Sequence, residues 1–302
     1  MMRLSSFKQY IVGLCLSILV SISYADAKIV TITSNQFSTL NAKAIELANN
    51  YGPSHVLIVY DIDNTLLAMN QNLGSDQWFS WQEHLLKNKP HAKVLVANNF
   101  QGLLKAQGLL FELSDMHLTE KDIPSIIQHL KTQGYPMLVI TSRGHDFDHT
   151  TLKALNNNDL NFSHSFDVTM PKGNYYPYRL GNLKDSGLTE KDVLVALMNK
   201  KPREVAFEQG VLFGAGQNKG ILLKTLLAKS ATEIKAVIFI DDSQKNITQF
   251  NQVMANTNLA IISIRYSAED AVVKAFQASN KHNVTLQWQK LNQTLNEVFK
   301  SS

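Results

Sequence analysis

Residues 56–67 read VLIVYDIDNTLL, and this stretch decides the fold. Five apolar or aromatic residues run without alternation into Asp61, and a second acid, Asp63, follows two positions later. An unbroken apolar run of this length is typical of a parallel strand that is covered on both faces. The two carboxylates would then lie at the carboxyl end of a buried strand, which is where open α/β sheets bind their ligands.

The chain contains three further apolar runs of this kind, at Met137–Ile140, Ala236–Ile240 and Leu259–Ile264. The pattern at Val205–Phe213 predicts a hairpin. Helical patterns separate the runs, at 39–50, 76–88, 120–133, 148–156, 190–199, 219–229, 244–255, 267–279 and 286–299. Two of these helices follow the repeated sequence LTEKD, which reads as a capping-box variant each time. The alternation predicts an α/β fold with a Rossmann-like, doubly wound parallel sheet.

Two connections are longer than an ordinary crossover. Residues 68–133 are mostly helical in pattern, and we expect them to form a small helical cap inserted after the first strand. The core would then comprise residues 28–67 and 134–302. The second connection, 158–205, includes a loop rich in Pro, Gly and Tyr, and no linker indicates an independent second domain.

The N-terminus has the pattern of a secretory signal peptide. Arg3 and Lys8 precede an apolar stretch, Ile11–Ala25, which is shorter than the roughly 20 residues that a membrane-spanning helix needs. Small residues then allow cleavage after 25 or after 27; an uncleaved membrane anchor is the alternative. We therefore expect a bacterial protein that is exported to the periplasm or secreted, without stable membrane insertion after cleavage. Cys15 is the only cysteine, so the cleaved chain would have neither disulfides nor thiol chemistry.

Composition and charge limit the domain organisation and the classes of binding partner that we expect. The 302 residues are 44% hydrophobic, which suits one large domain or a domain with an insert. The formal net charge is +4, but the Lys and Arg residues are scattered and form no basic stripe. We therefore expect no nucleic-acid partner.

Polar side chains follow three of the predicted strands. Asp61, Asp63 and Thr65 follow the first, and Asp241 and Asp242 follow the run at 236–240. The strand at 137–140 is followed by a hydroxyl pair and a cation, namely Thr141, Ser142 and Arg143. Clustered carboxylates repel one another unless a cation neutralises them, and hard oxygen ligands beside a phosphate site favour Mg²⁺. Lys219, at the start of a helix, is a candidate for neutralising a transferring phosphoryl group.

Four of these segments resemble, in order, the four motifs of the haloacid dehalogenase (HAD) superfamily: DIDNT at 61–65, ITSR at 140–143, Lys219, and IDDSQKN at 240–246. The resemblance covers about residues 54–265. The wider pattern is similar to an uncharacterised exported HAD-like family of bacteria and, more distantly, to periplasmic acid phosphatases. It implies a HAD core with the helical cap described above.

The resemblance also implies a role for each residue. Asp61 would be the nucleophile that forms an aspartyl-phosphate, and Asp63 would be the general acid and base. Thr141, Ser142, Arg143 and Lys219 would bind the substrate phosphate. Asp61, the backbone carbonyl of Asp63, and Asp242 would hold Mg²⁺, with Asp241 and Asn246 as further candidates. Asn246 departs from the family pattern, which often has an acid there, so its contact with the metal stays open.

An acid at position 63 implies a phosphatase, because carbon–halogen cleavage in the superfamily needs no proton donor there. The resemblance therefore implies an exported, Mg²⁺-dependent phosphomonoester hydrolase that acts on a small phosphorylated substrate. A phosphotransferase that uses the same intermediate and a non-catalytic protein that binds a phosphorylated ligand are the alternatives.

Other motifs have competing interpretations. The EF-hand spacing fails for DIDNT because Leu66 stands where a glycine is needed. HDFDH at 145–149 would place two histidines on one helix face for zinc, but no third ligand is evident. Trp78 and Trp81 lie one helical turn apart and either pack the core or face a substrate.

Overall fold

Seven strands form the central sheet of the computed structural model, which describes residues 29–197 and 201–299. Their order is β1-β9-β8-β2-β5-β7-β6, and all neighbours are parallel except β6 and β7, which form an antiparallel hairpin. The strands are β1 (Ile29–Ser34), β2 (Val56–Tyr60), β5 (Met137–Thr141), β6 (Ala206–Glu208), β7 (Val211–Phe213), β8 (Ala236–Asp241) and β9 (Ala260–Tyr266). The predicted α/β fold with a mostly parallel sheet is confirmed.

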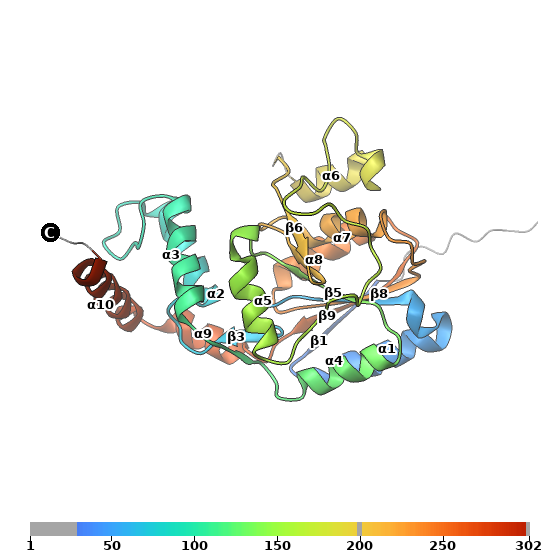
Figure 1. Cartoon of the computed structure of the whole chain (residues 1–302), viewed down its shortest axis with the longest axis horizontal. Helices are drawn as coiled ribbons and strands as arrows, with labels where there is room; N and C mark the ends of the chain where they lie inside the picture. Colours follow the sequence, from blue (N-terminus) through green and yellow to red (C-terminus); the bar gives the residue numbers. More distant parts are fainter. Residues whose placement is uncertain (1–28, 198–200, 300–302) are drawn as a thin grey trace, which may run out of the picture.

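Helices cover both faces of this sheet (Figure 1). Because successive side chains of a strand point to opposite faces, β2 sends Val56, Ile58 and Tyr60 to one face and Leu57 and Val59 to the other. The first face packs against α1 (Ser38–Tyr51), α4 (Ile123–Thr132) and α5 (Asp148–Asn156). The second packs against α7 (Lys219–Leu227) and α8 (Gln244–Met254). Burial on both faces explains why the strand sequences do not alternate.

A helical lobe lies beside the sheet, at the left of Figure 1. It combines α2 (Asp76–Asn88) and α3 (Phe100–Leu113) with the C-terminal α9 (Asp270–Ala278) and α10 (His282–Phe299). Its apolar centre includes Trp78 and Leu103 from the first pair and Phe276 and Val284 from the second. A two-stranded antiparallel ribbon connects the lobe to the sheet domain. Its strands are β3 (Leu67–Met69), which precedes α2, and β4 (Met116–Leu118), which follows α3.

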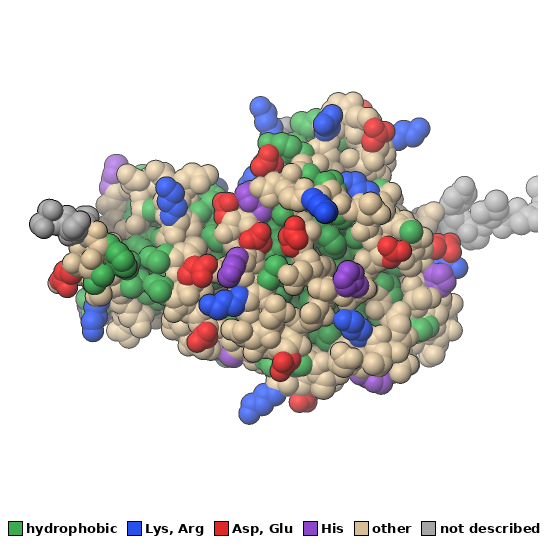
Figure 2. Space-filling view, in the orientation of Figure 1, with side chains coloured by type: hydrophobic (Ala, Val, Ile, Leu, Met, Phe, Trp, Pro, Cys, Tyr) green, Lys and Arg blue, Asp and Glu red, His purple; other side chains and the backbone are tan. Residues whose placement is uncertain are grey.

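The packing of this lobe differs from the expected cap of residues 68–133. Helix α4 lies inside that range, yet its buried residues Ile123, Ile127 and Leu130 pack on the sheet core beside α1. The other half of the lobe is formed by α9 and α10, which lie near the C-terminus of the sequence. Hydrophobic side chains remain exposed on it, as Figure 2 shows over the region of α3 and α10.

The two LTEKD sequences do different things. At the second, the Asp192 carboxylate accepts from the backbone N–H and hydroxyl of Thr189, and the Thr189 hydroxyl accepts from the Asp192 N–H, which caps α6 (Glu190–Leu197). At the first, the capping-box prediction is wrong. The Thr119 hydroxyl donates to the Thr65 carbonyl instead, and the Glu120 carboxylate accepts from the Phe37 N–H, so this segment ties β4 to the core.

The remaining described elements are three short 3₁₀ turns, η1 (Pro53–His55), η2 (His145–Phe147) and η3 (Lys184–Ser186). The predicted signal peptide at 1–25 and its alternative cleavage point after 27 lie outside the described residues. Within the part of the chain that the structure describes, no helix combines the length and the apolar character that crossing a membrane requires.

Candidate active site

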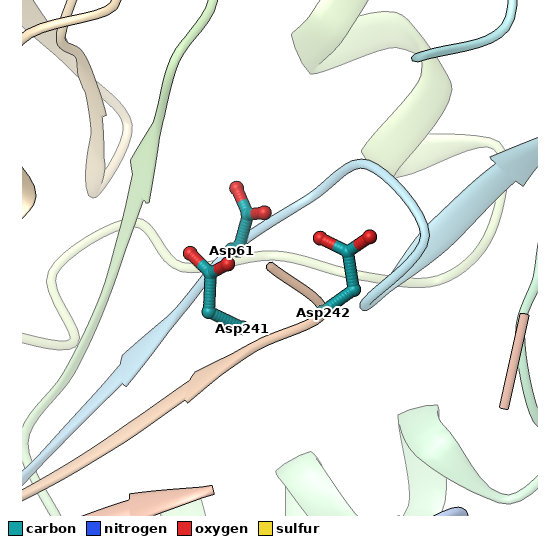
Figure 3. Close-up of side chains that lie close together, drawn as sticks. All are labelled: Asp61, Asp241 and Asp242. Carbon is teal, nitrogen blue, oxygen red and sulfur yellow. The ribbon is translucent and has the colours of Figure 1, made fainter. Parts of the chain in front are cut away.

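The carboxyl ends of β2 and β8 bring three carboxylates together at one edge of the sheet (Figure 3). The strands are paired with Tyr60 opposite Ile240, and the Asp61 N–H continues the ladder by donating to the Ile240 carbonyl at 3.0 Å. Asp61 therefore lies beside Asp241, the last residue of β8, and Asp242 follows. One carboxylate oxygen from each of Asp61, Asp241 and Asp242 lies within 4.8 Å of the others.

Lys219 joins two of these acids. Its Nζ lies 2.6 Å from Asp61 Oδ1 and 2.6 Å from Asp241 Oδ2, and its side chain is almost entirely buried. The lysine begins α7, whose N-cap Asn218 accepts from the backbone N–H groups of Gly220 and Ile221. The cap fixes the start of the helix, and the helix start aims the lysine at the end of β2.

Asp241 is the hub of the hydrogen bonds around Lys219. Besides the lysine, it accepts from the Asn246 amide, with Nδ2 3.1 Å from both carboxylate oxygens, and from the Ser243 N–H at 2.8 Å. Its oxygens are thus largely occupied by protein donors, which suits an anchor for Lys219. The Asn246 amide nitrogen donates to Asp241 in this arrangement, and contact of Asn246 with the metal stays a prediction.

Asp63 is held by Arg143 in a two-pronged ion pair. Arg143 Nε donates to one oxygen at 3.0 Å and Nη2 to the other at 2.8 Å. The rest of the guanidinium is also engaged, because Nη1 donates to the Thr151 hydroxyl at 2.9 Å and the group stacks over Phe111 at 4.0 Å from the ring centroid. A planar fork of this kind orients the Asp63 carboxylate, and the expected contact of Arg143 with a substrate phosphate stays a prediction.

The other residues predicted after β5 occupy different surroundings. Thr141 is buried, and its hydroxyl accepts from the Arg143 N–H at 3.1 Å, which leaves its proton free to donate. Ser142 is exposed, and its backbone carbonyl accepts from the Gly216 N–H at 2.9 Å. Thr141 therefore sits at the same sheet edge as the acids with a donor available, whereas Ser142 contributes a loop contact.

The DIDNT turn is locked to the β8 end of the site. Asn64 adopts a left-handed backbone conformation, with φ of 56°, which reverses the chain directly after Asp63. The Thr65 hydroxyl accepts from the Asp242 N–H at 3.0 Å, and Asn64 Nδ2 lies 3.5 Å from Asp242 Oδ2. These contacts fix Asp242 relative to Asp61.

Burial and mutual repulsion make the acids hard to ionise. Burial raises the pKa of Asp61 to about 8, with Lys219 opposing the rise and Asp241 adding to it. Burial, then repulsion from Asp241 and Asp76, raises the pKa of Asp242 well above its usual range. Burial alone would lower the pKa of Lys219, but the charges of Asp241 and Asp61 outweigh it and raise that pKa.

The donor set fits a divalent cation. Lys219 is shared by Asp61 and Asp241, and Arg143 is taken by Asp63. Within residues 29–197 and 201–299, no Lys or Arg forms an ion pair with Asp242. Carboxylate oxygens at low number are the ligands that Mg²⁺ uses beside waters and a phosphate. Asp61 and Asp242 would hold such an ion, with Asp241 adjacent. His145 and His149, the alternative zinc pair, are not in the cluster that the described residues form.

Asp76 is a site residue that sequence reasoning missed. It is the first residue of α2, after the N-cap Ser75, and it lines the same cavity as Asp242. Desolvation of the carboxylate, then repulsion from Asp63 and Asp241, raises the pKa of Asp76 to about 7. The sequence Ser75-Asp76 reads as an ordinary helix start, and only the fold places it opposite the acids.

We expect the metal-free protein to lose stability as the pH rises from about 5 to about 8. The raised pKa values of Asp61 and Asp76, about 8 and about 7, mean that the folded state still binds protons which the unfolded chain has released. The unfolding free energy therefore falls with rising pH across this window. Thermal denaturation in a chelator measures the slope.

Mg²⁺ should raise the denaturation midpoint more at about pH 8 than at about pH 5, because protons and the metal compete for the same oxygens. Asp242→Asn should weaken both effects. A midpoint that rises with pH in the chelator would contradict the electrostatic description of the site.

A family model described as "Protein of unknown function (DUF2608)" matches residues 34–300. The match includes every residue of the site described above, together with the helical lobe. No curated protein matches the chain.

Proposed function

Since the chain belongs to a protein family of unknown function (DUF2608), we propose its activity from the site itself: Mg²⁺-dependent hydrolysis of a phosphomonoester through an aspartyl-phosphate on Asp61. The observation that carries the proposal is Asp61 at the end of β2, 2.6 Å from the buried Lys219 and grouped with Asp241 and Asp242. The HAD-type motifs of the sequence and the order in which they occur support it. The helical lobe would be the cap of such an enzyme.

In the first step, Asp61 attacks the phosphorus as the bond from phosphorus to the alcohol oxygen breaks. The alcohol leaves with a proton, and the phosphoryl group stays on the Asp61 oxygen. In the second step, a water attacks the same phosphorus, its proton is removed, and inorganic phosphate leaves while the Asp61 carboxylate is restored. Lys219 lowers the repulsion between Asp61 and the incoming phosphoryl oxygens throughout.

Asp63 is our candidate for moving the proton in both steps. Each of its oxygens accepts from Arg143, and each keeps a further lone pair that can take or share a proton. The two-pronged contact sets the direction of that lone pair, so Arg143 is a positioning residue. The Thr141 hydroxyl would donate to a phosphoryl oxygen. When bound, Mg²⁺ would neutralise phosphoryl charge beside Asp61 and Asp242.

Arg143→Lys should lower kcat about 10-fold to 100-fold while changing KM little. The substitution keeps the charge but loses the planar fork that aligns Asp63, and misalignment of a reacting group costs rates of this order. Steady-state kinetics across pH test this, because a mispositioned acid–base group changes the pH profile of kcat. If KM rose while kcat held, Arg143 would be binding the substrate phosphate, as the resemblance implies.

A panel of phosphomonoesters with and without Mg²⁺ tests the function as a whole, using the chain without the predicted signal peptide at residues 1–25. Adding an alcohol acceptor and looking for its phosphorylated product separates hydrolysis from phosphotransfer. Phosphate release that requires Mg²⁺ is expected. Binding of phosphomonoesters without turnover would favour a phosphate-ligand binding protein and overturn the enzymatic proposal.

A further inference from the structure

A cavity of about 330 Å³ opens beside the acids, between α2 and α9. Asn64, Asp76 and Asp242 line its inner end, and the lobe supplies the rest of the wall. The volume lies at the small end of the range for ligand pockets in proteins. We call it the lobe pocket. Because it meets the site at Asp242, a substrate whose phosphate reached Asp61 could place its leaving group there.

The walls of the lobe pocket combine two aromatic rings with amides. Trp81 of α2 and Phe276 of α9 meet edge to face, with ring centroids 6.3 Å apart and planes at 73°. The two rings thus form an apolar corner. Gln77 of α2 and Gln277 of α9 also line the pocket, and amide groups can both donate and accept hydrogen bonds. A flat ring fits against such a corner and can use its edge for hydrogen bonds.

A lysine just after α9 lies in the wall of the pocket. This residue is Lys281, with Nζ donating to the carbonyls of Gln277 and Ser279 at 2.9 and 2.8 Å and lying 4.7 Å from the Phe276 ring centroid. Its charge is thereby occupied by carbonyls and a ring face, which leaves no strong demand for a second anion on the leaving group. The aromatic and amide side chains that line the lobe pocket therefore suit a neutral ring.

We propose that the lobe pocket selects phosphomonoesters whose alcohol carries a compact, neutral, aromatic or heteroaromatic ring, and that the C-terminal helix α9 is part of this specificity site. This inference rests on the proposed phosphatase activity and adds the class of substrate. Trp81 would contact the ring face, in addition to packing against the apolar centre of the lobe. Trp78, one turn earlier, is buried in the lobe centre.

The matched substrates are uridine 5′-monophosphate and ribose 5-phosphate, which share the same primary phosphoester and differ in the ring. We expect kcat/KM to favour the first by about tenfold, the size of a good aromatic contact with its buried area. Trp81→Ala should bring the ratio close to one, mainly through KM. Trp288→Ala is the control, because Trp288 packs in the same lobe but does not line the pocket.

Trp81→Ala also removes packing from the lobe, so Ser80→Phe provides a second test. Ser80 is exposed and lines the pocket, and a ring at that position would fill the space without removing a core contact. It should also abolish the preference for uridine monophosphate. Equal preference ratios in wild type, Trp81→Ala and Ser80→Phe would overturn the pocket assignment while leaving the phosphatase in place.

Binding separates the two claims. In the Asp61→Asn variant with Mg²⁺, titration calorimetry should give a lower Kd for uridine monophosphate than for ribose 5-phosphate. Adding Trp81→Ala to that variant should remove the difference in Kd. Ring-dependent binding without turnover by the wild type would overturn the phosphatase and keep the pocket. Absence of both turnover and ring-dependent binding would overturn both.

Discussion

Asp61→Asn should lower kcat by at least about 10⁴-fold, because an amide oxygen cannot form the covalent intermediate on which the proposed reaction depends. The substitution is nearly isosteric, and the strand that holds the residue is buried on both faces, so the fold should survive. Phosphate release from the best substrate of the panel measures the loss. Far-ultraviolet circular dichroism and thermal denaturation check that the variant is folded.

Asp192→Asn is the matched control for this change. Asp192 is also a buried carboxylate in a lysine ion pair, with Lys224 Nζ 2.6 Å away, but it belongs to α6 rather than to the acid cluster. It should keep kcat near wild type and lose stability. Equal kcat values for Asp61→Asn and wild type would show that another residue is the nucleophile.

Lys219→Met should lower kcat about 10³-fold, the effect of removing a preorganised charge from the site of phosphoryl transfer. The buried Asp61 and Asp241 would lose their shared cation. Proton uptake would then restore neutrality, which converts the nucleophile into its unreactive acid form. The activity of the variant should therefore fall further behind wild type as the pH is lowered. Initial rates across pH, with Mg²⁺ held constant, measure this.

Lys224→Met tests whether such an effect belongs to the site or to any buried lysine on α7. Lys224 lies five residues later on the same helix and forms an equally short ion pair with Asp192. Its loss should cost about 3–5 kcal/mol of unfolding free energy, as for other broken buried pairs, and leave kcat nearly unchanged at a temperature where the variant is folded. If both variants lost activity in proportion to stability, Lys219 would be a structural residue.

The strands that carry the site could be predicted closely because a strand buried on both faces has an unbroken apolar sequence. The run at 56–60 is β2 without error, and the hairpin expected at 205–213 became β6 and β7 around Gln209 and Gly210. β1 was missed, since Ile29–Ser34 alternates apolar and polar residues as an edge strand does and follows directly on the predicted signal peptide. The ribbon of β3 and β4 was missed because three-residue strands carry almost no pattern.

Placement of the acids at one sheet edge follows from strand ends alone, whereas the partners of each acid do not. The sequence put Arg143 and Asp63 near each other but could not indicate that the guanidinium would be fully engaged by Asp63, Thr151 and Phe111. Likewise, identical LTEKD sequences gave a capping box only where Asp192 could also reach Lys224. In both cases, tertiary contacts determined which hydrogen-bond partners the side chains have, and the local sequence did not.

The helical lobe contains helices that the sequence did not assign to it, for a related reason. Apolar faces on α2 and α3 indicate that something covers them, but amphipathic patterns do not identify the covering partner. The covering helices are α9 and α10, which follow α2 and α3 in the sequence only after most of the sheet strands. The lobe pocket depends on that meeting, since Trp81 and Phe276 belong to the two halves.

The most direct test of the central claim is to trap the intermediate. Wild-type protein turning over its best substrate with Mg²⁺ is quenched in acid, digested and analysed by mass spectrometry. A peptide spanning residues 56–67 that carries one phosphoryl group on Asp61, absent from Asp61→Asn and from samples without substrate, is the predicted result. Turnover with no phosphoryl group on that peptide, or with the group on another residue, would contradict the mechanism.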